Sequence, residues 1–259
     1  MIELIDTHCH FDDERFDHDR EAVYQQAVSA GVGSLVIPAV VKSRWQKVFD
    51  LAKEYKNVFA TAGLHPVYIE QHKDSDLLAL DALLAEGNCV AVGECGLDRF
   101  AKHLDFTRQR YFFEQQLSLA SKHQMPLIVH ARNATEDVIL AIKNIKTQTT
   151  GVIHSYNGSL EQAKQLIEMG YLLSFGGAIT YDRATRLRKL ITELPLESIM
   201  VETDAPDQPG STHNGHRNEP AYLPEVVATI ARLRDTDQEI IASTSNTNAC
   251  RLFNLPQSL

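Results

Sequence analysis

Short apolar runs rich in Val, Ile and Leu recur along the chain, and longer stretches of mixed apolar and polar positions separate them. Strands buried in a parallel sheet have this continuous apolar character, because helices cover the sheet. The pattern therefore predicts strands that alternate with helices. The expected strands are residues 4–5, 35–37, 58–60, 90–92, 127–129, 152–153, 171–173 and 199–201.

The stretches between these runs predict helices at residues 19–30, 76–85, 108–123 and 160–169. Eight strand-then-helix units in 259 residues, without a Pro-, Gly- or Ser-rich linker, favour an α/β fold built as one (β/α)8 TIM barrel. We expect residues 1–259 to form a single domain. The competing interpretation is a doubly wound sheet, but no G-x-G-x-x-G turn follows the first strand.

Composition narrows the possible functions. The hydrophobic content of 44% supports a sizeable core, and the excess of Asp and Glu over Lys and Arg gives a net charge of -9. Bulk charge therefore repels nucleic acid and anionic membranes, so any contact with a phosphate must be local. The longest apolar run, residues 35–41, is too short to cross a membrane.

We expect a cytoplasmic protein. The N-terminus lacks the basic and apolar layout of a signal peptide. The cysteines have neither C-x-x-C spacing nor the density of a disulfide framework, which indicates reduced thiols. No feature of the sequence indicates an obligate protein partner.

Candidate chemistry begins where the first expected strand ends, in the segment from Asp6 to Asp12. Side chains at positions i and i+2 of an extended segment point the same way, so His8 and His10 can bind one cation. A single H-x-H motif is equally consistent with two unrelated histidines. The rest of the chain must decide between these readings.

Further potential ligands follow other expected strands, and in a barrel all these strand ends open on the face that holds the active site. A lone histidine at a strand end more often bonds a backbone carbonyl, but several in the same position favour a metal site. Six ligands suit two cations with a shared carboxylate better than one closed tetrahedral site. The six are His8, His10, Glu94, His130, His154 and Asp204.

Three longer motifs are LIDTHCHFD at 4–12, PLIVHARNATE at 126–136, and LP followed by IMVETDAP within 194–206. They resemble the signatures of the TatD family of metal-dependent hydrolases, in particular its YjjV-like branch. Further similarities are GECGLD at 93–98, RNEP at 217–220 and NACRLF at 248–253. The resemblance covers nearly the whole chain.

This resemblance implies a (β/α)8 barrel of amidohydrolase type, a divalent-metal site and a deoxyribonuclease activity that trims single strands from the 3′ end. Two departures from the family pattern lie close to the motifs. Arg99 and Phe100 follow Asp98 where an aromatic residue commonly comes first, and Tyr156 stands where phenylalanine is common. The implied metal ligands are His8, His10 and Asp204 for one ion, His130 and His154 for a second, and Glu94 as the bridge between them.

The expected reaction is hydrolysis of a phosphodiester by a metal-activated water. Glu94 and Asp204 are the expected catalytic carboxylates, with Asp204 as both ligand and base. His65 and Arg132 are the candidates for holding the phosphate. Alternatively, Arg132 forms a salt bridge with Glu136 one helical turn away, and His65 is a weak extra ligand or supports the ligands from outside.

Histidine ligands favour Zn, Fe or Mn as the two bound divalent ions, while Mg or Mn in excess could support activity. The expected substrates are DNA ends or short single-stranded, nucleotide-containing molecules, because Arg132 and Arg217 are the few cationic candidates near the site. One alternative is an amide or lactone hydrolase, since the same activated water can attack a carbonyl. Another is a metal-binding scaffold without catalysis.

Overall fold

The computed structural model describes residues 3–145 and 148–256. In this part of the chain eight strands alternate with helices, and all the pairings between strands are parallel. All eight expected strands are present. They are β1 (Leu4–Asp6), β2 (Val32–Ile37), β3 (Val58–Ala60), β4 (Val92–Asp98), β5 (Leu127–Arg132), β6 (Gly151–Ile153), β7 (Tyr171–Phe175) and β8 (Ile199–Val201).

The four expected helices are confirmed, with ends within two residues of the expected ones. The helix after β4 begins where the Asp105 carboxylate accepts hydrogen bonds from the N–H groups of Thr107 and Arg108. No helix in the described ranges has the length and apolar character needed to span a bilayer. The helices are α1 (Arg20–Ser29), α2 (Lys42–Glu54), α3 (Asp74–Ala85), α4 (Phe106–His123), α5 (Thr135–Asn144), α6 (Leu160–Glu168), α7 (Thr185–Glu193), α8 (Leu223–Arg234) and α9 (Gln238–Phe253).

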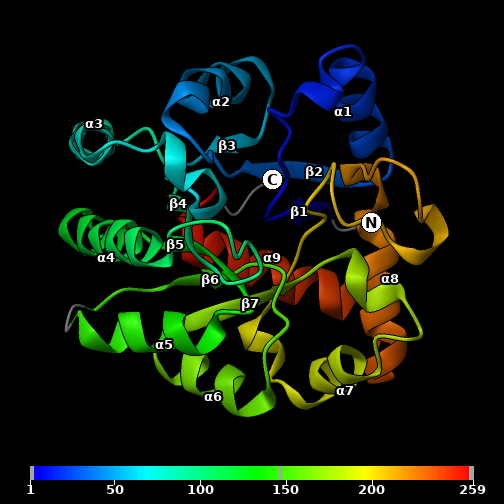
Figure 1. Ribbon diagram of the computed structural model, residues 1–259. Coiled ribbons are helices and arrows are strands. Elements are labelled where there is room, and N and C mark those ends of the chain that lie inside the picture. Colours follow the sequence, from blue (N-terminus) through cyan, green and yellow to red (C-terminus); the bar gives the residue numbers. More distant parts are fainter. Residues whose placement is uncertain (1–2, 146–147, 257–259) are drawn as a thin grey trace.

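The strands follow one another around a ring in chain order, and helices surround the ring (Figure 1). The ladders run from β1 to β3 and from β4 to β8. Hydrogen bonds cross both seams, because Ala62 forms a parallel bridge with Val92, and the Thr7 N–H donates to Val201 O at 3.3 Å. Sequential order without reversal excludes the doubly wound sheet and confirms the TIM barrel.

Helix α9 seals one end of the ring. In Figure 1 it passes behind the strands, and its contacts include β8, β1 and the neighbouring helix α8. Ala249, Phe253 and the following Leu255 form one buried cluster with apolar side chains that point into the ring. The opposite, carboxyl end of the strands is left for polar side chains. The other members of the cluster lie in the strands, apart from Ala91, which directly precedes β4: Ile5, Val36, Ala91, Ile128, Val152, Leu172 and Met200.

Two strands differ from the expectation in a way that concerns the site. Instead of ending at residue 92, β4 begins there and continues to Asp98, and β5 continues past residue 129 to Arg132. The parallel ladder extends from Cys95 paired with Val129 to Asp98 paired with Arg132. Glu94 and His130 therefore lie inside strands, and their expected positions after the strands were wrong.

We expect Phe253→Ala to lower the free energy of unfolding by about 3–5 kcal/mol, because removal of a buried aromatic ring leaves a cavity between α9 and the strands. Phe253 is 2% exposed, whereas Ile240 on the same helix is 45% exposed. Ile240→Ala should therefore change stability by less than about 1 kcal/mol. Urea denaturation followed by circular dichroism measures both, and equal effects would contradict the sealing role of α9.

Candidate metal centre

Glu94 lies at the centre of the polar cluster, and a break in the β4 ladder places it there. The register between β4 and β5 shifts between Val92 and Cys95, so Gly93 and Glu94 form a bulge, a feature that can redirect a side chain. Gly93 must be small, since a Cβ at this position would lie 2.8 Å from both Cβ and O of Ile128. The Glu94 carboxylate is 1% exposed.

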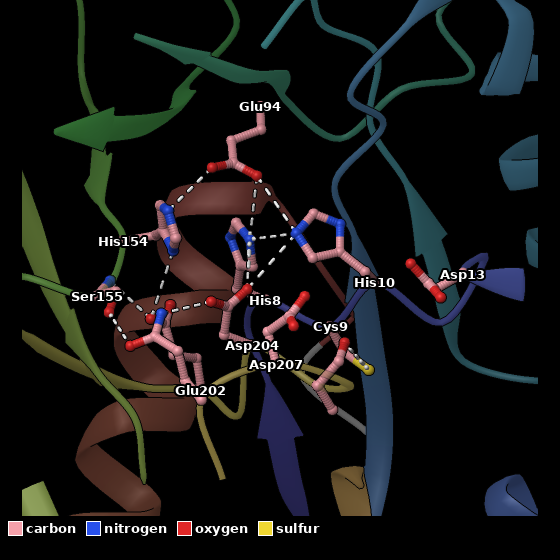
Figure 2. A network of polar contacts seen from close by, with 12 residues as sticks. His8, Cys9, His10, Asp13, Glu94, His154, Ser155, Glu202, Asp204 and Asp207 are labelled. Carbon is pink, nitrogen blue, oxygen red and sulfur yellow. Dashed lines mark hydrogen bonds and ion pairs between the residues drawn. The ribbon is translucent and has the colours of Figure 1, made fainter. Parts of the chain in front are cut away.

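One oxygen of Glu94 faces a group of potential metal-ligand atoms that follow the ends of β1 and β8. Glu94 Oε2 lies 3.3 Å from His8 Nε2 and 3.5 Å from His10 Nε2. Asp204 Oδ1 lies 3.5 Å from each of these two nitrogens, and the nitrogens are 3.4 Å apart. Figure 2 shows all four side chains pointing toward one another.

The spacing of this first group fits the ligands of a metal ion. Ligands placed tetrahedrally at about 2.0–2.1 Å from a zinc ion lie about 3.3–3.4 Å apart. The five measured separations range from 3.3 to 3.5 Å. Two imidazoles and two carboxylates are also ligand types that divalent transition metals accept.

The other oxygen of Glu94 faces a second group. Glu94 Oε1 lies 3.2 Å from His130 Nδ1 and 2.9 Å from His154 Nε2, and these two nitrogens are 3.2 Å apart. His130 comes from within β5, and His154 directly follows β6. The buried Glu94 carboxylate thus lies between two groups of potential metal ligands, with one oxygen toward each.

Hydrogen bonds alone do not satisfy these groups. In each pair of histidines two ring nitrogens face each other, at 3.4 or 3.2 Å, and their lone pairs repel unless one of the two nitrogens carries a hydrogen. Glu94 Oε2 has no hydrogen-bond donor in residues 3–145 and 148–256. Burial raises the pKa of Glu94, but the charges of His65, His154 and His8 outweigh burial and bring the pKa well below its ordinary value. An anionic carboxylate among imidazole nitrogens is an environment suited to cations.

Two carboxylates that sequence reasoning missed lie behind the second pair of histidines. Asp98 Oδ2 accepts a hydrogen bond from His130 Nε2 at 3.0 Å, which leaves His130 Nδ1 facing inward. Glu202 Oε1 faces His154 Nδ1 at 3.6 Å, and also accepts from the Ser155 N–H at 2.6 Å. Burial lowers the pKa of His154, but Glu94 and Glu202 raise it well above its ordinary value.

Comparison with known proteins identifies the family of this chain. The profile described as TatD related DNase matches residues 5–254. The chain belongs to the TatD family of metal-dependent hydrolases. The expected family and its YjjV-like branch are thereby confirmed, and the chain is 40% identical to the uncharacterized metal-dependent hydrolase YjjV of Escherichia coli over 99% of this chain and 100% of the relative.

Two further comparisons extend the likeness. The crystal structure of YjjV, a TatD homologue from Escherichia coli, superposes with a TM-score of 0.94 at 39% identity and covers 98% of this chain and 99% of that one. The protein named 3′-5′ ssDNA/RNA exonuclease TatD, from Cronobacter sakazakii, is 29% identical over 96% of this chain and 97% of its own length. The first comparison supports the barrel, and the second relative carries a nuclease name.

Two hollows flank the TatD-family centre. A cavity of about 630 Å³ lies on the side of His130 and His154, and its wall includes Arg132. A smaller hollow of about 210 Å³ lies on the side of His10 and His65. A substrate can therefore reach the potential metal ligands from both sides.

The predicted phosphate-binding residues have different surroundings. Arg132 makes no ion pair with Glu136 in the described ranges, and its guanidinium lies 3.8 Å from the centre of the Phe100 ring. Arg217 is a weaker candidate than the sequence suggested, because it pairs with Asp19 at 2.7 Å and Glu219 at 2.8 Å. Of the two arginines predicted near the site, Arg132 is thus the one whose charge remains available.

His65 is held as a hydrogen-bond donor to the Glu94 carboxylate. Its Nδ1 accepts a hydrogen bond from the Val67 N–H at 3.1 Å, so the neutral ring carries its proton on Nε2, which lies 3.0 Å from Glu94 Oε1. Burial lowers the pKa of His65 to about 4, so the ring is neutral at pH 7. This arrangement disfavours His65 as a metal ligand, although the nitrogen is near enough to form a group with Glu94 and His130.

We expect nitrogen NMR of the metal-free protein at pH 7 to show His65 protonated at Nε2, because the Val67 N–H occupies the lone pair of Nδ1. Comparison with His65→Gln assigns the signal, and exposed His18 provides an internal reference ring. A His65 ring protonated at Nδ1 would show that the Val67 contact does not set its tautomer.

Proposed function

We propose that this protein is a divalent-metal-dependent phosphodiesterase, a deoxyribonuclease that removes nucleotides from a strand end in the manner of a 3′ exonuclease. The observation that carries the proposal is the position of the Glu94 carboxylate between two groups of potential metal ligands. One of its oxygens faces each group, at 2.9–3.5 Å from the histidine nitrogens. Two-metal centres with a shared carboxylate are common among enzymes that cleave phosphodiesters. The family description and the name of the Cronobacter relative point to the same activity.

The residues divide between two ions. His8, His10 and Asp204 would hold one, His130 and His154 the other, and Glu94 would contribute one oxygen to each. When bound, two divalent ions supply Lewis-acid activation of a water molecule and of a phosphoryl oxygen. The histidine-rich donor set favours Zn, Fe or Mn in the isolated protein, and Mg or Mn in excess supports turnover.

Asp204 has the position required of a proton acceptor. Its Oδ1 faces His8 and His10, while its Oδ2 accepts a hydrogen bond from the Gln208 side chain, which sequence reasoning missed. Gln208 in turn accepts from Ser155 Oγ at 3.0 Å, on the wall of the larger cavity. A carboxylate oxygen has two lone pairs, so Oδ2 can accept a proton from the attacking water while Gln208 fixes its direction.

The charges near the site favour a strand end over the middle of a long duplex. The chain carries a net charge of -9, so it repels a polyanion at long range. Arg132 has no acidic partner within the described ranges, whereas Arg15 pairs with Asp13 and Asp207, and Arg217 pairs with Asp19 and Glu219. Few phosphates can therefore be engaged at once.

We expect Glu94→Ala to lose the second metal ion more readily than the first, because His8, His10 and Asp204 still form a three-ligand group while His130 and His154 are left as two. Elemental analysis after dialysis against a weak chelator measures the content of each variant. The exposed Glu70→Ala is the control and should retain the parent content. If Glu94→Ala keeps two ions per chain, Glu94 is not the bridge.

We expect metal-loaded protein to degrade short and long linear single strands at similar rates and to leave a closed circular single strand intact, because few phosphates are bound. Electrophoresis of end-labelled products across a salt series measures this, and the salt dependence should be shallow. Internal cutting of the circle with steep salt dependence would contradict the end-acting proposal. Turnover of lactones or cyclic amides without DNA cleavage would favour the amide or lactone alternative.

A further inference from the structure

The larger cavity has an aromatic ring on its wall that packing does not explain. Phe100 is 57% exposed, although Phe112 and Phe113 on the neighbouring helix α4 are buried. The Arg132 guanidinium lies over the Phe100 ring, 3.8 Å from its centre. Both residues line the cavity together with His130 and His154. Singly exposed apolar side chains are common on protein surfaces, so the exposure of Phe100 matters only because the ring lies on the wall of the cavity that also contains His130 and His154.

The Asp98 carboxylate links the backbone of Phe100 to His130. Asp98 Oδ2 accepts from His130, and Asp98 Oδ1 accepts from the Phe100 N–H at 2.7 Å and the Ala101 N–H at 3.0 Å. Arg132 lies two residues after His130 in β5, so their side chains project from the same side of the strand. The backbone of Phe100 is therefore held next to His130, and the side chains of Phe100 and Arg132 lie on the same cavity wall as the His130 ring.

The cavity wall carries both cations and carboxylates: Glu136 and Asp137 line it, and Asp137 is already paired with Arg99 at 2.6 Å. Arg132 and Arg186 both line the cavity, and neither pairs with a carboxylate in residues 3–145 and 148–256. Arg186 donates to O and Oδ1 of Asn157 at 2.9 Å, which holds its guanidinium at the wall. Two cations beside an exposed aromatic ring provide for both the anionic and the planar part of a nucleotide.

We propose that Phe100 and Arg132 form a stacking platform for the nucleobase next to the scissile phosphate. This inference rests on the proposed nuclease function and adds the substrate group that the larger cavity binds. The base extends the Arg–Phe stack, and the edge of the Arg132 guanidinium remains free to donate hydrogen bonds to the adjoining phosphate. Stacking on a π-face does not distinguish the bases, so the platform binds any base.

The binding test compares two probes that differ only in the base. Titration of the Mn²⁺-loaded protein with deoxyadenosine 5′-monophosphate and with 2-deoxyribose 5-phosphate should show the nucleotide bound at least about 5-fold more tightly, which is the lower end for stacking of one base. Phe100→Ala should lose this preference, and Phe100→Trp should keep it. Tyr111→Ala is the matched control, because Tyr111 is also an exposed aromatic, at 42%, but lines none of the described cavities.

The cleavage test uses a single-stranded oligonucleotide and a copy with an abasic residue at the end that the parent protein removes. For the normal strand, Phe100→Ala should raise KM about 5-fold or more with little change in kcat. For the abasic strand, Phe100→Ala and the parent should have the same KM. Arg132→Ala should raise KM for both strands, because it also loses the phosphate contact.

The two tests separate failure of the platform from failure of the nuclease proposal. If the parent cleaves DNA but Phe100→Ala binds and cleaves as the parent does, the platform is wrong and the nuclease stands. If the parent cleaves no DNA but still binds the nucleotide through Phe100, the nuclease proposal fails and the platform stands. If the parent shows no preference for the nucleotide over the sugar phosphate, the platform is overturned whatever the activity.

Discussion

The arrangement of the site depends on one buried negative charge, the carboxylate of Glu94. An ionised carboxylate taken out of water loses several kcal/mol of hydration energy, and it persists only where opposite charges or donors replace that hydration. Five imidazoles surround Glu94, and the nearest nitrogen of each lies 2.9–3.5 Å from one of its oxygens. Because the histidines come from β5 and from the loops after β1, β3 and β6, this one carboxylate connects the carboxyl ends of most of the barrel.

The barrel supplies the rigidity that such a cluster needs. Apolar side chains fill the ring and α9 covers its far end, so the strands cannot shift independently near the site. The Asp98 carboxylate then sets the direction of the His130 ring through a hydrogen bond at 3.0 Å, and the Glu202 carboxylate faces the His154 ring at 3.6 Å. These contacts favour metal binding because they decide which ring nitrogen faces inward before any ion arrives.

Much of the site could be predicted from sequence because parallel strands end on one face. His8 and His10 share one side of an extended segment, and His154 and Asp204 follow apolar runs that form strands. The bulge at Glu94 could not be predicted, since it depends on how β4 pairs with β5. The roles of Asp98 and Glu202 were missed for the same reason, because each acts on a histidine from another strand.

The surroundings of the arginines were the least predictable part. Arg217 pairs with Asp19, which is 198 residues away in the sequence, so no local pattern shows that its charge is already matched. Arg132 contacts Phe100 rather than Glu136, because the paired strands β4 and β5 place the two side chains at the same rim. Local spacing predicts what one element offers, whereas long-range pairing decides which charges stay available.

The most direct test of this account is anomalous X-ray diffraction from crystals of the Mn²⁺-loaded protein, which locates each ion without assuming its ligands. The account predicts two peaks about 3.5–4 Å apart. One should lie among His8, His10 and Asp204, the other beside His130 and His154, with one Glu94 oxygen on each. A single peak, or two peaks of which only one contacts Glu94, would contradict it.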